Sequence, residues 1–383
     1  MKGMDKRIGY GSKLYEESLA VNTEAVRLHT IAVNEQLWMN NLGQNIPIIR
    51  AGKDLKNYPR NTGKPCLIIG GGPSVTAKNE DNDDQLDILY ESSAYHNDKV
   101  FIIACDKMLK ACLEKGIYPH MVTGLDGTTD VTEFFRGIDL DLEGEVAVAL
   151  SVMTHPDTLV EAMRLFGPEN VYWFMGLWDD HREPKSMTRI IHWLTNGKVI
   201  LQTLGNVGAL SLFVGLHLDS NEVAFMGLDY GYPADTPIEE TQYYNGYRNL
   251  VKEWNTKLDE RNAQLTAAHE QEVAAWEKWR GDMEQMYGRP MDFTSSFYDK
   301  PKPPAKLKKK NIYSCYRYII NPDTHKHVLV GLNWDVYRQI FLSFARLKPG
   351  SIPLINVSPT SSLYGPGIKT QSLEEWLKEV DAR

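Results

Sequence analysis

The order of apolar and polar positions along the chain predicts an alternation of short buried strands and helices. Apolar runs bounded by turn residues are typical of buried strands, whereas apolar positions three or four residues apart indicate helices. The predicted strands are Cys66–Ile69, Val100–Cys105, His120–Leu125, Val146–Leu150, Val171–Met175, Glu222–Gly227, Val328–Val330 and Pro353–Ile355. The predicted helices between or after them are Lys107–Lys115, Asp157–Phe166, Gly205–Leu216 and Trp334–Leu347. This alternation predicts a parallel sheet and an α/β fold.

The pattern at the N-terminus differs from that of the strand region. Residues 13–42 have apolar positions among charged and amide residues and predict a helical region that packs on the sheet. Residues 43–64 contain Pro47 and Pro59 and predict a connector. The division expected from these patterns is 1–64 for the N-terminal helical region and connector, 65–245 for the main α/β domain, 246–312 for a helical insertion with a Lys/Pro-rich loop, and 313–383 for a C-terminal α/β part that completes the core.

The insertion is predicted to be helical because Tyr247–Arg280 has no glycine or proline and carries apolar residues at four-residue spacing, as at Leu250, Trp254 and Leu258. One long helix and a helical hairpin are both compatible with this pattern. A single helix of this length would reach about 50 Å. It would offer a surface for a partner or for association into a homo-oligomer.

A segment rich in lysine and proline follows the insertion. Lys300–Lys310 contains six lysines and three prolines, a composition that does not form a compact core. A solvated loop, a nucleic-acid-binding segment and a lid whose lysines meet the phosphates of a ligand are the alternatives.

Composition narrows the classes of partner and the compartment. The 383 residues carry a formal net charge of -8, which opposes general binding to nucleic acid or to acidic membranes. No apolar stretch approaches the length of a membrane span, and the N-terminus has no apolar signal core, so the expected localisation is cytoplasmic. The four cysteines lack Cys-x-x-Cys spacing and are expected to be buried free thiols.

Candidate chemistry gathers where three predicted strands end. Gly70–Ser74 follows the first strand and has the composition of a turn that brings backbone N–H groups close to a phosphate. Asp106 and Asp126 follow the next two strands. Because ligands of open parallel sheets bind beyond the carboxyl ends of the strands, the turn and both carboxylates are expected to line one crevice. Helix or turn capping is the alternative role for each aspartate.

Four ordered blocks of the sequence carry a family resemblance. They are Leu67–Ser74, Ile102–Gly127, Leu204–Tyr230 and, more weakly, Ile355–Ser358. Over roughly residues 30–245 the chain resembles the 6-hydroxymethylpterin diphosphokinase MptE-like family, which is related to the sialyltransferase-like motility accessory factors. The resemblance implies a Rossmann-like domain that binds a nucleotide and transfers part of it, with a nucleotide and a small-molecule or glycan acceptor as partners.

The resemblance also implies roles for particular residues. Asp126 and Asp229 are the expected catalytic residues, and Asp106 with Asp126 would hold Mg²⁺. The residues expected to bind the nucleotide are Gly70, Gly71, Gly72, Pro73, Ser74, Asp106, Gly127, Gly205 and Asn206.

Three functions remain open at this point. The first is transfer of a diphosphate from ATP to a hydroxymethyl acceptor with magnesium; here Gly124 stands where the archaeal diphosphokinases look to carry another aspartate. The second is transfer of a nonulosonic acid from its CMP conjugate; the relatives' histidine after the position of Asp229 has no counterpart in Glu239–Tyr244. The third is nucleotide binding without catalysis.

Overall fold

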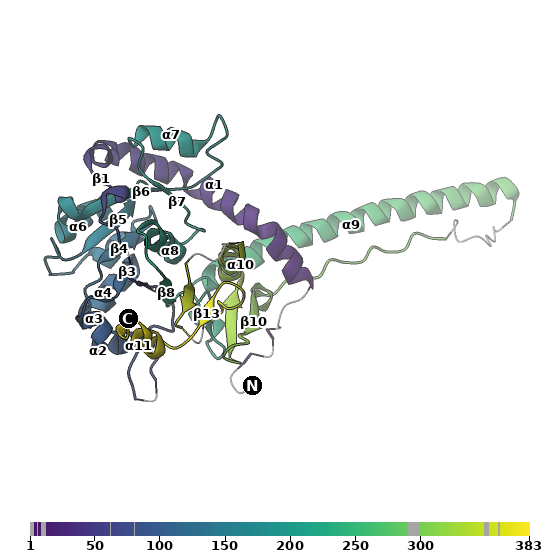
Figure 1. Ribbon diagram of the computed structural model, residues 1–383. Helices are drawn as coiled ribbons and strands as arrows, with labels where there is room; N and C mark the ends of the chain where they lie inside the picture. Colours follow the sequence, from purple (N-terminus) through teal and green to yellow (C-terminus); the bar gives the residue numbers. More distant parts are fainter. Residues whose placement is uncertain are drawn as a thin grey trace. The chain divides into compact units, whose positions relative to one another are not determined.

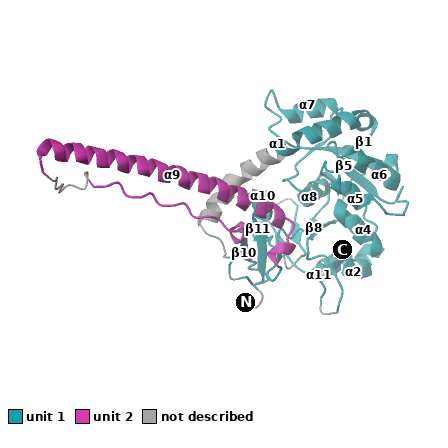
Figure 2. Ribbon diagram, turned by 180° about the vertical axis from the view of Figure 1, so that it is seen from behind, with its two compact units in different colours: residues 1–236, 317–383 teal, residues 237–316 magenta. Residues whose placement is uncertain are grey.

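The computed structural model describes two compact units. The described residues are 4–5, 7–8, 13–61, 63–79, 81–289, 299–347, 352–358 and 361–383, with side chains of the N-terminal helix described from residue 31 onward. One unit comprises residues 1–236 and 317–383, and the other comprises residues 237–316 (Figure 2).

The larger unit is built on a parallel sheet (Figure 1). Its strands are β1 (Lys53–Asp54), β2 (Cys66–Ile69), β3 (Phe101–Cys105), β4 (Met121–Gly124), β5 (Ala147–Ser151), β6 (Val171–Gly176), β7 (Ile200–Leu201), β8 (Val223–Met226), β12 (Leu354–Asn356) and β13 (Lys369–Thr370). Their order is β1-β6-β5-β4-β3-β2-β8-β12-β13, with β7 paired to β6. The pairs whose register is defined within this sheet are parallel, which confirms the predicted α/β class.

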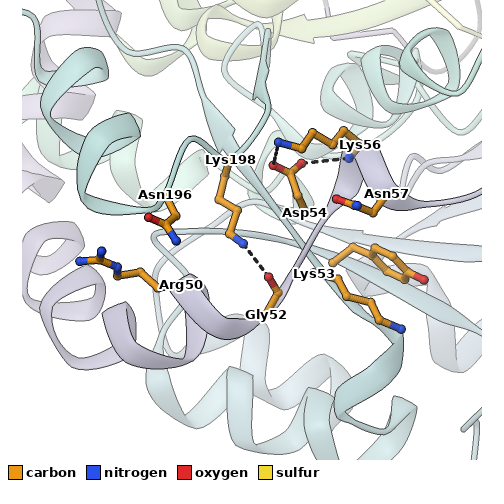
Figure 3. A pocket seen from close by; sticks show the side chains of 9 residues that line it. Arg50, Gly52, Lys53, Asp54, Lys56, Asn57, Asn196 and Lys198 are labelled. Carbon is orange, nitrogen blue, oxygen red and sulfur yellow. Dashed lines mark hydrogen bonds and ion pairs between the residues drawn. The ribbon is translucent and has the colours of Figure 1, made fainter.

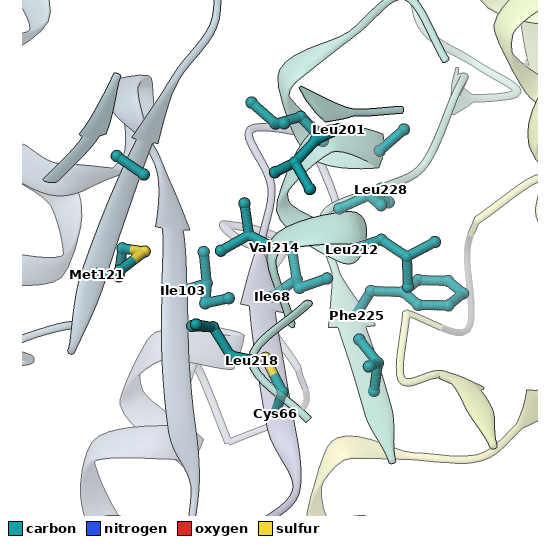
Figure 4. Packing of buried hydrophobic residues seen from close by; sticks show 14 of the residues in the cluster. Cys66, Ile68, Ile103, Met121, Leu201, Leu212, Val214, Leu218, Phe225 and Leu228 are labelled. Carbon is teal, nitrogen blue, oxygen red and sulfur yellow. The ribbon is translucent and has the colours of Figure 1, made fainter. Parts of the chain in front are cut away.

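Helices cover both faces of this sheet. They are α1 (Lys13–Ala51), α2 (Gln85–Glu91), α3 (Ser93–His96), α4 (Leu109–Glu114), α5 (Asp130–Phe135), α6 (Pro156–Phe166), α7 (Met187–Leu194), α8 (Val207–His217), α10 (Leu332–Leu347) and α11 (Leu373–Asp381). Side chains alternate between faces: Ile68 and Ile103 pack with α8 (Figure 4). Leu67 and Ile102 pack in a separate cluster with α2 and α11. The strands are therefore buried on both sides, as their continuous apolar runs predict.

The strand order contains one reversal that places the candidate site. From β2 the chain proceeds outward through β3, β4, β5 and β6, and α8 then returns it to β8 on the other side of β2. This is the Rossmann-like arrangement, and β2 and β8 flank its topological switch point. Beside this sheet, β9 (Tyr232–Pro233), β10 (Tyr316–Ile320) and β11 (His327–Gly331) form a small sheet in the order β10-β11-β9.

The predicted end of the N-terminal helix at residue 42 is wrong. Helix α1 continues to Ala51 with Pro47 inside it, so the predicted connector begins nine residues later than expected. An internal proline costs about 3 kcal/mol of helix stability. Burial of Leu42 and Ile49, together with a hydrogen bond from Asn45 Nδ2 to the carbonyl of Thr154, offsets that cost.

The smaller unit is built around α9 (Tyr244–Tyr287), a continuous helix of 44 residues. The hairpin alternative is therefore wrong. Residues 299–311 run along this helix as an extended segment, hereafter the strap. Association of copies through α9 stays a prediction.

Paired hydrogen bonds hold the strap to α9. Asn262 donates from Nδ2 to the Leu307 carbonyl over 3.0 Å and accepts from the Leu307 N–H over 2.8 Å. Asn255 makes the same pair with the backbone of Lys310, at 2.9 Å in both directions. Lys309 pairs with Asp259 at 2.8 Å. Contact of the strap's lysines with a bound nucleotide stays a prediction.

The prediction for the cysteines is confirmed, and the C-terminal helix begins with a regular cap. All four cysteines are buried and free, and Ser372 with Glu375 forms a capping box at the start of α11. Within the described residues, no helix is both long enough and apolar enough to cross a membrane.

Candidate functional site

The candidate site lies where the strands of the large sheet end. Gly70–Ser74 follows β2, Asp106 follows β3, Asp126 follows β4 and Asp229 follows β8. Because these four strands are adjacent and parallel, their carboxyl ends share one edge of the sheet. The residues form two groups: the glycine-rich turn with Asp229, and an acidic pair made of Asp106 and Asp126.

The glycine-rich turn packs against the exit of β8. Gly70 N–H donates to the Met226 carbonyl and Gly72 N–H to the Gly227 carbonyl, both over 2.8 Å. A Cβ at Gly70 or Gly72 would lie 2.6 Å from the Gly227 carbonyl oxygen, a distance that real Cβ atoms do not adopt. The close approach of two strand exits therefore explains both glycines.

Asp229 holds this turn through two hydrogen bonds from Ser74. Its Oδ2 accepts the Ser74 N–H over 2.7 Å, and its Oδ1 accepts the Ser74 hydroxyl over 2.7 Å. The Ser74 Oγ also lies 3.0 Å from the Oγ of Ser358, which accepts the Gly227 N–H over 2.9 Å. Burial raises the pKa of Asp229 to about 6, against the opposing effect of the two hydrogen bonds from Ser74.

These contacts leave Asp229 and Ser74 facing each other inside the protein. Asp229 is 3% exposed and Ser74 is 5% exposed. The backbone N–H groups of Gly70, Gly72 and Ser74 already donate within the protein, and Pro73 has none. Phosphate binding by this turn stays a prediction. The groups still available to a phosphate are the exposed Gly71 and the Lys107 side chain beside it.

The acidic pair combines one buried and one exposed carboxylate. Asp106 is 5% exposed, and its Oδ1 accepts the Lys107 N–H over 2.8 Å. Burial raises the pKa of Asp106 to about 7, and the negative charge of Asp126 adds to the shift. Asp126 is exposed, and its Oδ1 accepts the Thr128 N–H over 3.0 Å. The charge of Asp126 therefore acts on Asp106, and binding of one ligand by both carboxylates stays a prediction.

Helix α8 begins next to this pair. Asn206 caps the helix by accepting the Ala209 N–H over 2.9 Å, and it also accepts the Tyr230 hydroxyl over 3.2 Å. Gly205 has φ +84°, and a Cβ there would lie 2.7 Å from the ring of Tyr337. Burial raises the pKa of Tyr337, and the charge of Asp126 contributes to the shift. Tyr337 therefore lies against Gly205 and within range of the charge of Asp126.

Gly127 has a packing role in the structure. Its carbonyl accepts Asn41 Nδ2 of α1 over 2.8 Å, and the same Nδ2 donates to the Met153 carbonyl over 3.0 Å. A Cβ at Gly127 would lie 2.7 Å from both the Met153 carbonyl oxygen and the ring of Trp38. The glycine lets α1 pack over the loops that follow β4 and β5, and nucleotide binding by Gly127 stays a prediction.

The donor set of the acidic pair fits magnesium. Mg²⁺ takes oxygen ligands and is commonly held by one or two carboxylates together with substrate phosphates and water. Among the residues that the structure describes, no group of three or more His, Cys, Asp or Glu side chains is placed to hold a metal ion. Two carboxylates are enough for magnesium carried in with a nucleotide, and too few for a closed zinc site.

Three residues of this region escaped prediction from the sequence. Lys107 immediately follows Asp106, Tyr230 immediately follows Asp229, and Tyr337 comes from α10, which is far away in sequence. Adjacency to a predicted aspartate was an available signal for the first two. Tyr337 lies within an amphipathic helix and had no such signal.

The fold and the acidic pair define a Rossmann-like α/β protein with a candidate site at the carboxyl edge of its sheet. The model of the family "6-hydroxymethylpterin diphosphokinase MptE-like" matches residues 38–235, about half of the chain. The chain belongs to this family, as its motifs predict, and membership supports a transferase role.

Comparison with solved structures finds a glycosyltransferase. The motility accessory factor (MAf) glycosyltransferase from Magnetospirillum magneticum AMB-1 is 14% identical with a TM-score of 0.46. The match covers 90% of this chain but 41% of the glycosyltransferase, so the chain spans about two fifths of that protein's length. Among curated protein sequences, none matches this chain.

Proposed function

We propose that the protein is a nucleotide-dependent transferase that works through Asp106 and Asp126. The observation that carries the proposal is the buried carboxyl of Asp106 beside a second carboxylate at the carboxyl edge of the sheet. Placing a carboxyl in an apolar environment next to a like charge costs free energy, and such pairs cluster at functional sites. Family membership supports the same class of reaction.

The proposed reaction is transfer of a diphosphate from ATP to a hydroxymethyl group, the chemistry in the family's name. The acceptor oxygen attacks the β-phosphorus, the bond to AMP breaks, and the hydroxyl proton passes to a carboxylate. Asp126 is the exposed member of the pair and is the proposed proton acceptor. Asp106 and Asp126 would hold Mg²⁺, which when bound neutralises phosphate charge. Gly71 and Lys107 are the proposed phosphate contacts.

In this proposal Asp229 acts by positioning. It holds Ser74 by two hydrogen bonds and so keeps the glycine-rich turn against β8. This role replaces direct contact with the acceptor, because the carboxylate is buried behind the turn.

Transfer of a sugar from a CMP conjugate is the second candidate, favoured by the pKa of Asp106. A carboxyl with a pKa of about 7 is suited to proton transfer near neutral pH without a metal. In that reaction the acceptor oxygen attacks the anomeric carbon, CMP leaves, and the hydroxyl proton passes to Asp106. Noncatalytic nucleotide binding remains the third candidate.

Calorimetric titration with ATP and with CMP, each with and without Mg²⁺, separates these candidates. Magnesium-dependent ATP binding that Asp126→Ala weakens at least about tenfold is the expected result, since a charged contact is worth about 1.5–3 kcal/mol. The matched control is Asp139→Ala, which removes an exposed carboxylate elsewhere in the same unit.

The other outcomes select among the alternatives. CMP binding without metal supports sugar transfer. Binding of ATP without turnover of reduced hydroxymethylpterin or other hydroxymethyl acceptors favours the noncatalytic role. Failure of folded wild-type protein to bind either nucleotide contradicts the proposal.

A further inference from the structure

A basic pocket lies beside β1, the edge strand of the large sheet (Figure 3). It has a volume of about 420 Å³, within the usual range for sites that take small ligands. Its walls are the C-terminal end of α1, β1 with the turn that follows it, β6 at Tyr172, and the turn before β7. The residues that matter for its chemistry are Arg50, Lys53, Asp54, Lys56, Asn196 and Lys198.

Two of the four cations of the basic pocket have carboxylate partners. Lys53 pairs with Glu169 at 2.9 Å, and Lys56 pairs with Asp54 at 3.3 Å. Asp54 is further occupied by the backbone N–H groups of Lys56 and Val199. Arg50 and Lys198 form no ion pair among the residues that the structure describes, so the basic pocket holds four cations against two carboxylates, Asp54 and Glu169.

Lys198 is the first of the two cations that form no ion pair. It is 4% exposed, and its Nζ donates to the Gly52 carbonyl over 2.6 Å. An ammonium group has three N–H donors, and this carbonyl is the one acceptor for them among the residues that the structure describes. Burial lowers the pKa of Lys198, and the charge of Asp54 opposes this shift only in part. A buried ammonium with unused donors is stabilised by an anion placed beside it.

Arg50 is the second cation that forms no ion pair among the described residues. It lies near the end of α1 and lines the same cavity as Lys198. No acceptor for its guanidinium is found within the described part of the chain. Arginine binds phosphate through paired N–H donors in a fixed fork, and Asn196 adds a neutral amide donor to the same wall.

We infer that the basic pocket binds a phosphate dianion between Arg50 and Lys198. The excess of two cations over carboxylates at the basic pocket matches the charge of about -2 on a phosphate monoester or on inorganic phosphate near neutral pH. None of Gly71, Asp106, Lys107 and Asp126 lines the basic pocket, so the bound phosphate does not take part in the transfer step. The inference stands independently of the proposed function.

Titration calorimetry of the full chain at low ionic strength tests this inference, with inorganic phosphate and glycerol 3-phosphate as probes. Saturable binding to the wild type is expected, and Arg50→Gln should weaken it about tenfold or more because a charged hydrogen bond is lost. Arg50 is exposed, so this variant should fold normally. Arg189→Gln removes another exposed arginine of the same unit and should leave binding unchanged.

The two probes distinguish the sources of the phosphate. Tighter binding of glycerol 3-phosphate assigns the site to a phosphate monoester, and tighter binding of inorganic phosphate assigns it to the free ion. No saturable binding of either probe to the wild type, or equal affinity in Arg50→Gln, would overturn the inference. Lys198→Met provides a second variant, in which phosphate should no longer raise the thermal unfolding temperature as it does in the wild type.

Discussion

Asp106 and Asp229 both follow strands of the parallel sheet, and both are buried with a raised pKa, yet their surroundings give them different roles. Asp229 accepts two hydrogen bonds from Ser74, so its carboxylate is used inside the protein. Asp106 accepts the neighbouring Lys107 N–H and lies beside the charge of Asp126. The number of hydrogen bonds, together with the neighbouring charge, separates a positioning residue from a candidate catalytic one.

Removal of the Ser74 hydroxyl should destabilise the protein. Ser74→Ala leaves Asp229 Oδ1 without its donor, and loss of a hydrogen bond to a charged group costs about 1.5–3 kcal/mol. The free energy of unfolding at pH 8, measured with urea, should fall by about this amount. The loss should be smaller at pH 5, because Asp229, with a pKa of about 6, is then largely protonated.

Thr76→Ala is the matched control for this prediction. Thr76 is an exposed hydroxyl residue two positions further along the same loop, and its removal should leave stability within about 0.5 kcal/mol of the wild type. If Ser74→Ala unfolds like Thr76→Ala at both pH values, the positioning role of Asp229 is wrong.

At the scale of elements, the contact residues of α9 and of the strap are spaced by the same distance along the two segments. Asn255 and Asn262 are seven helical residues apart, about 10.5 Å along the axis. Their partners Leu307 and Lys310 are three extended residues apart, about 10 Å. The same register places Lys300 next to Glu277, where the two form an ion pair at 2.8 Å. One register therefore accounts for contacts along most of the strap.

Asn262→Ala should loosen the strap at Leu307. The substitution removes both hydrogen bonds to the Leu307 backbone, each worth about 0.5–1.5 kcal/mol. Hydrogen exchange of the Leu307 amide should accelerate by about tenfold, as measured by mass spectrometry or NMR.

Gln271→Ala is the control for this change, since Gln271 is an exposed side chain of the same helix. It should leave exchange at Leu307 unchanged. Equal exchange at Leu307 in the wild type and in Asn262→Ala would show that other contacts hold the strap.

At the scale of the whole molecule, the two buried aspartates make stability depend on pH. Their folded-state pKa values, about 7 for Asp106 and about 6 for Asp229, lie above the ordinary aspartate value of 3.8. Between about pH 4 and pH 7 the folded protein therefore binds more protons than the unfolded chain. The free energy of unfolding contributed by these groups falls as pH rises through this window.

Asp106→Asn should remove the larger part of this fall in the free energy of unfolding with rising pH. The amide oxygen can still accept the Lys107 N–H, and no charge forms at high pH. We expect the variant to be more stable than the wild type at pH 8, and the stability difference between the two to shrink by about 1–3 kcal/mol on going to pH 5. Urea unfolding at the two pH values measures this difference, and nucleotide binding by the variant shows what the substitution costs in function.

Asp139→Asn serves as the control for this pH dependence. Asp139 is exposed, so its substitution should leave the pH profile of stability unchanged. A profile of Asp106→Asn that parallels the wild type would contradict a strained carboxyl at this position.

The sequence alone determined the α/β class, the parallel strands and the presence of acidic residues where strands end. These features depend on local pattern: runs such as Cys66–Ile69 are apolar throughout because both faces are covered, and Asp106 and Asp126 directly follow their strands. Their meeting at one edge follows from parallel pairing. The motifs also predicted the protein family, and the match over residues 38–235 confirms it.

The tertiary structure decided the features that depend on partners distant in sequence. Gly70 and Gly72 face Gly227 because β2 pairs with β8, and no local pattern shows that pairing. Pro47 stays inside α1 because distant strands bury the residues on either side of it. The basic pocket joins Arg50 to Lys198 in the same way. Local periodicity reports which face of an element is buried, whereas long-range packing determines which residues meet there.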